Sequence, residues 1–197
     1  MAIQTYDDLK AAVARWLKRT NLADAPEDFI TLAEAKLNRR LKVRQMRSVL
    51  QLTPTSAYVA LPGDYRSAIR VMYGNTPLRF LPESMADPSM NLGGDFNRYA
   101  LIGDKIWLLT QVDGKSVLTL HYYQQLEPLS ETNTSNWLLE DGPDIYLYAS
   151  LLEAEPYIKN DERIVVWQSK LEEALRDIGA LDDEGQHSGS DLTMEAG

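Results

Sequence analysis

Two short patterns in the sequence suggest catalytic or metal chemistry, and neither is complete. Gly114-Lys115-Ser116 matches the end of a phosphate-binding loop, but that loop requires a glycine five residues before Gly114, where this chain has Leu109. His121 lies in an alternating stretch typical of a surface strand, and His187 lies in a polar C-terminal region. The chain has no cysteine, so these two histidines cannot form an ordinary zinc site. We therefore expect no catalytic residue, no metal and no cofactor.

Carboxylates are abundant, but none of their clusters has the spacing of a calcium loop. The electrostatics of helix N-termini explains the first two clusters and solvation explains the third. These clusters are Glu140-Asp141, Asp161-Glu162 and Asp182-Asp183-Glu184.

The most concentrated charge is basic and lies in residues 36–47. Cations at this position complement the C-terminus of a helix, and they also suit a contact with an acidic neighbour or with nearby DNA. Both interpretations stay open for Lys36, Arg39, Arg40, Lys42, Arg44 and Arg47. Trp137, in a polar stretch between Asn136 and Leu138, is the best candidate for an aromatic interface anchor.

The net charge of −9 is unevenly distributed along the 197 residues. Residues 1–50 contain ten Lys/Arg and six Asp/Glu, whereas the remainder contains ten and twenty-three. An acidic protein has little general affinity for nucleic acid, and segregated charge indicates that different faces meet different partners. No apolar run is long enough to span a membrane and the N-terminus does not resemble a signal peptide, so we expect synthesis in a cytoplasm.

Apolar residues recur at helical spacing near both ends of the chain. They predict helices over about 5–19 and from Pro26 to about 41, then from about 145 to a stop at Pro156, and finally from Asn160 to about 178. The region after Gly179 is rich in Asp, Glu, Gly and Ser and predicts an extended tail.

The middle of the chain predicts six or seven strands. Gly74-Asn75, Gly103-Asp104 and Asp113-Gly114 have the composition of tight hairpin turns, and the last two predict an antiparallel meander. The fold class is therefore α+β: N- and C-terminal helices form a small bundle and an antiparallel β domain is inserted. The predicted boundaries are 1–47 and 140–178 for the bundle, 48–139 for the β domain with a long loop at 82–98, and 179–197 for the tail.

Several stretches, in order over residues 5 to about 178, resemble the head-to-tail adaptor proteins of tailed bacteriophages. They are Tyr6–Lys10, Trp16-Leu17, Phe29–Leu41, Tyr58–Tyr65, Tyr122-Tyr123 through Ser130, Asn136–Leu139, Asp144–Ala149 and Ala154–Tyr157. The loop at 82–98 and the tail have no recognisable counterpart.

The resemblance implies a structural virion protein at the head–tail junction, without catalytic residues. It implies a ring, commonly of twelve copies, that lies under the portal protein, extends the DNA channel and docks a tail or nozzle protein. Genomic DNA would pass without sequence-specific binding. We expect the tail to dock on the portal through Asp182, Asp183, Glu184, Leu192 and Met194. Two alternatives are a DNA-binding regulator that uses the basic run and a metal-dependent hydrolase.

Overall fold

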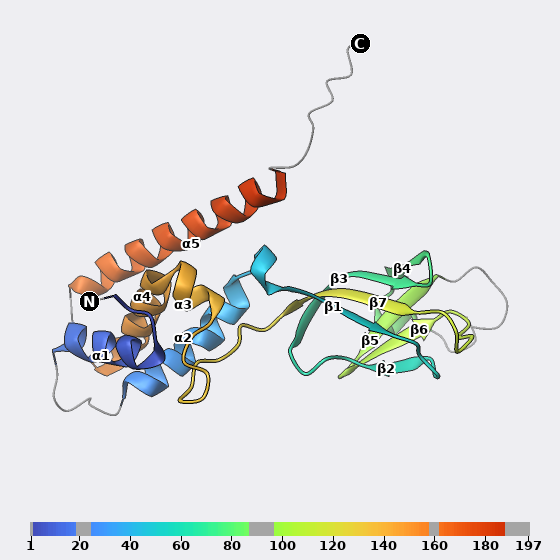
Figure 1. Cartoon of the computed structure of the whole chain (residues 1–197), viewed down its shortest axis with the longest axis horizontal. Helices are drawn as coiled ribbons and strands as arrows, with labels where there is room; N and C mark the ends of the chain where they lie inside the picture. Colours follow the sequence, from blue (N-terminus) through green and yellow to red (C-terminus); the bar gives the residue numbers. More distant parts are fainter. Residues whose placement is uncertain (1, 19–24, 87–96, 158–161, 188–197) are drawn as a thin grey trace, which may run out of the picture. The chain divides into compact units, whose positions relative to one another are not determined.

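A computed structural model of the chain describes residues 2–18, 25–86, 97–157 and 162–187. The chain divides into two compact units (Figure 1). A helical unit contains Met1–Gln45 and Leu126–Gly197, and a β unit contains Met46–Gln125. The N- and C-terminal helices contact each other and a central seven-stranded sheet completes the chain, so the α+β prediction is confirmed.

The first helix, α1 (Tyr6–Leu17), begins with a capping box at Thr5. The Thr5 Oγ1 atom accepts a hydrogen bond from the Asp8 amide, and Asp8 Oδ2 accepts one from the Thr5 amide, each at 3.2 Å. The helix ends because Lys18 adopts a left-handed conformation, with φ of 50°. It is therefore shorter than predicted.

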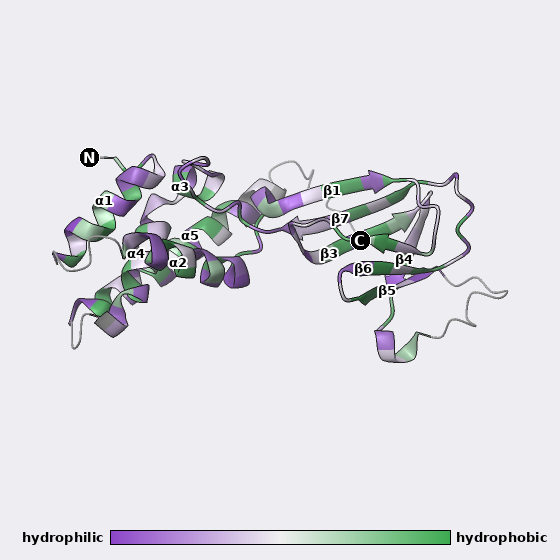
Figure 2. Ribbon diagram, turned by 90° about the horizontal axis from the view of Figure 1, so that it is seen from below, coloured by the Kyte–Doolittle hydropathy of each residue, from purple (hydrophilic) through white to green (hydrophobic). Residues whose placement is uncertain are grey.

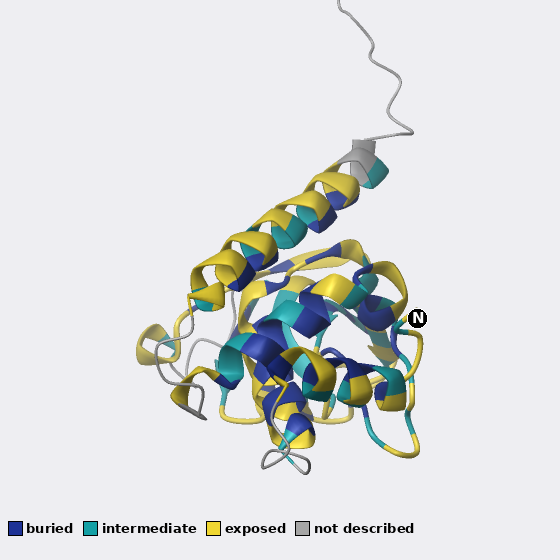
Figure 3. Cartoon of the chain, turned by 90° about the vertical axis from the view of Figure 1, so that its left-hand side faces the viewer, coloured by how far each residue is buried: buried dark blue, intermediate teal, exposed yellow. Residues whose placement is uncertain are grey.

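The helical unit is organised around α4 (Pro143–Glu153), which contacts α1, α2 (Pro26–Arg40), α3 (Trp137–Asp141) and α5 (Arg163–His187). Short 3₁₀ turns, η2 (Arg44–Met46) and η5 (Glu155–Tyr157), lie beside them. Figure 3 shows buried residues along one side of α5 and exposed residues along the other. The buried apolar residues include Leu9, Val13, Phe29, Ile30, Leu37, Leu138, Ile145, Leu151, Trp167 and Ile178.

The prediction of an extended tail from Gly179 is wrong as far as His187, because α5 continues to that residue. Asp182 lies one turn after the buried Ile178 and is itself buried, and its Oδ1 atom accepts a hydrogen bond from the Arg44 amide at 2.6 Å. This hydrogen bond attaches the last turns of α5 to Arg44, a contact that the polar composition of this region does not predict. The predicted cap, Asn160, lies outside the described residues.

Residues 126–139 belong to the helical unit, not to the β domain as predicted. The Leu126 amide donates to Asn38 Oδ1 at 2.7 Å, and the Leu129 amide donates to Glu34 Oε1 at 2.8 Å. Asn136 caps the short helix α3, whose Leu139 amide donates to its side chain. Polar side chains of α2 therefore hold this segment.

The β unit contains seven strands in the order β1-β7-β3-β4-β5-β6-β2. They are β1 (Arg47–Leu52), β2 (Tyr58–Ala60), β3 (Tyr65–Tyr73), β4 (Thr76–Phe80), β5 (Arg98–Ile102), β6 (Lys105–Leu109) and β7 (Leu118–Gln124). A 3₁₀ turn, η3 (Glu83–Met85), follows β4 within the predicted 82–98 loop, whose residues 87–96 lie outside the description. The hairpins at Gly74 and Gly103 are confirmed, and both glycines have positive φ.

Two details of the predicted antiparallel domain are wrong. Strands β6 and β7 are not neighbours, and β4 pairs with β5 in parallel. The connection before β7 is held against β3 instead: Asp113 Oδ1 accepts from Tyr73 Oη at 2.6 Å, and the Gly74 amide donates to the Val117 carbonyl at 2.8 Å. Strand β7 consequently pairs with β1 on one side and β3 on the other.

The curled sheet encloses its own core. Both halves of the strand order contribute to one buried cluster, which contains Val59, Val71, Leu78, Tyr99, Ile106, Leu108, Leu118, Leu120 and Tyr122. A smaller cluster of Leu81, Ala100, Trp107 and Leu109 lies on the opposite face of β5 and β6. Figure 2 shows hydrophobic and hydrophilic residues mixed along β1, β3 and β7, as expected for a sheet with one solvated face.

Candidate interaction surfaces

The described part of the chain shows no cluster of side chains suited to a metal ion. Within those residues, no group of three or more His, Cys, Asp or Glu side chains is placed to hold a metal ion. The described helices also include none that is long and apolar enough to cross a membrane.

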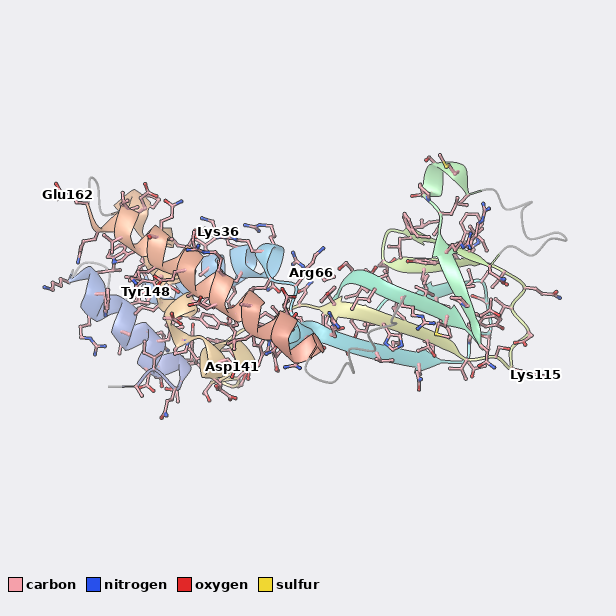
Figure 4. All side chains as sticks on the ribbon, turned by 90° about the horizontal axis from the view of Figure 1, so that it is seen from above. Lys36, Arg66, Lys115, Asp141, Tyr148 and Glu162 are labelled. Atoms are coloured by element: carbon pink, nitrogen blue, oxygen red, sulfur yellow. The ribbon has the colours of Figure 1, made fainter. Side chains whose placement is uncertain are left out.

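Two cations of the basic run are neutralised within the helical unit. Lys36 Nζ lies 2.6 Å from Glu153 Oε1 on α4, and Arg40 Nη2 lies 2.6 Å from Glu172 Oε2 on α5. Both lysine and arginine stay more than a third exposed, so each pair contributes little to stability. Figure 4 labels Lys36 on α2.

The other cations of the run lie in three different environments. Arg39 and Lys42 are exposed at the end of α2, and the Arg44 guanidinium lies close to Gly185 of α5. Arg47 belongs to β1 in the β unit, where its guanidinium lies 5.9 Å from the centre of the Tyr123 ring. The run is therefore divided between the two units, with Lys36 and Arg40 paired inside the helical unit and Arg47 in the β unit.

A groove of about 240 Å³ lies between α2, α4 and α5. Leu37, Ala149 and Leu171 contribute apolar surface, and the two ion pairs of Lys36 and Arg40 line it as well. Leu37 and Leu41, which alternate with the cations of the run, are buried in the core.

Trp137 is the first residue of α3 and is half-buried, not part of a loop as predicted. Glu140 and Asp141 follow three and four residues later, at the spacing that places side chains on the same side of a helix. Trp107 and Trp167 are core residues, whereas Trp16 is 37% exposed and packs edge-on against Tyr148.

The five residues predicted to dock on a portal have different positions. Asp182 is buried, Asp183 is exposed, and Glu184 also belongs to α5. Leu192 and Met194 lie outside the described residues.

A buried polar network in the helical unit was not predicted from the sequence. Glu34 is only 6% exposed, and its Oε1 atom accepts hydrogen bonds from the Leu129 amide at 2.8 Å and Tyr146 Oη at 3.0 Å. Asn136 Nδ2 donates to Tyr146 Oη at 2.7 Å and to the Glu127 carbonyl at 2.7 Å. The position of Glu34 in the sequence could have indicated its burial. It lies four residues after Ile30 and three before Leu37, on the apolar side of the helix.

Burial governs the protonation of this network. It raises the pKa of Glu34 above its ordinary value of 4.5, and the two hydrogen bonds that Glu34 accepts lower the pKa by less. Burial, followed by the charge of Glu34, also raises the pKa of Tyr146, so its hydroxyl stays protonated and donates.

We expect stability to fall as the pH rises from about 4.5 through the raised pKa of Glu34, because the folded state holds this proton more tightly. Glu34→Gln removes the titration. The free energy of unfolding of the wild type should therefore decline relative to that of the glutamine variant as the pH rises above about 4.5, measured by urea unfolding. A difference between the two proteins that is independent of pH would contradict this assignment.

A family model of the SU10 adaptor proteins matches residues 4–194. The chain belongs to the SU10 adaptor protein family. This is a family of phage head-to-tail adaptors, so the resemblance stated from the sequence is confirmed. Curated proteins give no significant match to the chain.

Family membership identifies the protein as a phage adaptor with a structural, non-enzymatic role, consistent with a place in the virion and with virion partners. The match includes both units, so the adaptor function applies to the chain as a whole. The surfaces described above are consequently candidates for contacts with other virion proteins.

Proposed function

We propose that this adaptor forms a ring under the portal protein, extends the DNA channel and docks the next tail component. The observation that supports this most directly is the family match over residues 4–194, which includes the helical unit and the β unit together. A ring subunit needs two different surfaces, one for each neighbour, because cyclic contacts of this kind are heterologous.

The charge of the two units supports such an arrangement. The helical unit contains 13 Lys/Arg and 23 Asp/Glu, a balance of −10, and the β unit contains 7 and 6, a balance of +1. The acidic excess is therefore confined to one unit. An acidic channel wall would neutralise few phosphates, so DNA could move past it without being retained.

The portal-docking element in this proposal is the C-terminal region of the chain. Asp183, Glu184, Leu192 and Met194 remain its proposed contact residues. Asp182 has a different role, since its carboxylate is buried and accepts a hydrogen bond from the Arg44 amide.

We expect the purified adaptor to form a ring, alone or at fixed stoichiometry on its cognate portal ring, as measured by native mass spectrometry. A variant that ends at His187 tests the docking element, because it keeps α5 and removes Leu192 and Met194. This variant should keep its thermal midpoint and lose portal binding. A wild-type protein that remains monomeric and ignores the portal would disprove the ring proposal.

A further inference from the structure

The outward face of three neighbouring strands, β1, β7 and β3, is cationic and aromatic. In the register of the sheet, Val49 lies opposite His121, which lies opposite Arg70. On one side of this middle row lies the row of Arg47, Tyr123 and Ser67. On its other side lies the row of Gln51, Thr119 and Met72. Residues between these rows, such as Leu118, Leu120 and Val71, are buried in the core of the unit, so the three rows point outward.

This outward face, defined by the three rows, contains no carboxylate. Neither Asp nor Glu occurs in β1, β3 or β7, which contain 6, 9 and 7 residues, although the chain has 29 acidic residues. Val49, in the middle row, is 51% exposed. A surface that combines arginine, tyrosine, methionine and an exposed apolar residue has the composition of a protein interface.

Six carboxylates of the helical unit lie beside a lysine or an arginine. Lys10 Nζ lies within 3.3 Å of Asp7, Glu27 and Glu131. Glu153, Glu172 and Glu173 are paired with Lys36, Arg40 and Lys170.

One contiguous group differs from these pairs. Glu140, Asp141 and Asp144, at the junction of α3 and α4, are all exposed and have no ion pair among the described residues. The Glu140 carboxylate accepts a hydrogen bond from Ser135 Oγ at 3.2 Å. The half-buried Trp137 lies one helical turn before Glu140 and Asp141, so aromatic surface adjoins the charges. We call Trp137, Glu140, Asp141 and Asp144 the acidic corner, and Figure 4 labels Asp141 in it.

We propose that, in the ring proposed above, the outward face of β1, β7 and β3 in one copy docks on the acidic corner of the next copy. The two surfaces have opposite charge, and each has an aromatic side chain beside its charged groups. They are two different surfaces, one on each unit, and a heterologous contact between successive ring subunits requires two different surfaces. Complementary charge of this kind sets the register of the contact and disfavours incorrect pairings.

A second copy fits this face better than DNA does. The charged side chains in its three rows are Arg47 and Arg70, so it could neutralise few phosphates. The exposed Val49 at its centre would gain nothing from a phosphate backbone, whereas it would be desolvated by a protein surface.

Charge exchange tests the contact on the intact adaptor with its portal ring. Arg70→Glu and Asp141→Arg should each raise the concentration for half-maximal ring assembly by about tenfold or more, because like charges then face each other. The double variant restores opposite charges and should assemble nearly as the wild type does. Lys115→Glu is the matched control: Lys115 is exposed in the turn before β7, outside the three rows, and should have no effect (Figure 4).

The outcomes separate this inference from the ring proposal. If wild-type rings form and Arg70→Glu assembles equally well, the ring stands and the assigned contact is wrong. If Arg70→Glu weakens binding to duplex DNA and leaves assembly unchanged, the face is a DNA contact and the inference is overturned. Arg47→Glu with Asp144→Arg is a second exchangeable pair, so a variant that fails to fold, judged by circular dichroism, does not prevent the test.

Discussion

Replacing Glu34 by alanine is expected to lower the free energy of unfolding by about 3 kcal/mol, because two buried donors lose their acceptor. The Leu129 amide and Tyr146 Oη both donate to Glu34 Oε1, and Glu34 is only 6% exposed. Alanine also leaves a cavity where the side chain packed, which adds to the loss.

Urea unfolding measures this effect, and two variants control it. Glu34→Gln keeps an acceptor oxygen in the same place and should cost much less than alanine. Glu127→Ala removes an exposed glutamate side chain from the same connecting segment and keeps the Glu127 backbone carbonyl, which accepts the hydrogen bond from Asn136. A Glu34→Ala protein within about 0.5 kcal/mol of the wild type would show that the network does not hold the segment to α2.

Trp167→Ala is expected to cost about 3–5 kcal/mol, because it removes the largest apolar side chain that α5 buries. Trp167 is 2% exposed, and Leu171 and Ile178 continue the same buried side of the helix. Arg163 also lies over its ring, 5.0 Å from the ring centre. Without this anchor α5 loses much of its attachment to α4, which it contacts along its buried side.

The chain contains its own control for this substitution. Trp16→Ala truncates the same side chain at a position that is 37% exposed and makes one edge-on ring contact, so it should cost about 1 kcal/mol. Thermal and urea unfolding of the two variants should differ clearly. Equal losses for the two tryptophans would mean that α5 is not anchored through Trp167.

These two substitutions also bear on the adaptor function. The buried network holds residues 126–139 close to α2, and this segment contains Trp137 of the acidic corner and leads directly into Glu140. Loosening α5 would alter the groove lined by the two ion pairs of Lys36 and Arg40, and it would move the start of the proposed portal-docking element. Ring assembly should therefore be measured on both alanine variants beside their stability.

Local sequence determined the elements and the fold class. The N-cap Thr5 and the proline at the first position of α2 specify helix starts. The apolar spacing from Phe29 to Leu41 specifies a buried helical face, and the glycines at 74 and 103 specify two hairpins. Each of these signals acts within a few residues, through a hydrogen bond, a dihedral angle or a side-chain period. The order of helices, strands and helices was sufficient to predict the α+β architecture.

Only tertiary structure decided which distant groups meet. The pairing of β7 with β1 and β3, the ion pairs that divide the basic run, the continuation of α5 past Gly179 and the burial of Glu34 all depend on residues far apart in the sequence. A turn such as Asp113-Gly114 permits a hairpin but does not select the strand that follows as its partner, because side-chain packing across the whole sheet sets that choice. Likewise, the sequence shows where the cations are but not which carboxylates lie next to them. The tertiary fold places Glu153 beside Lys36 and Glu172 beside Arg40.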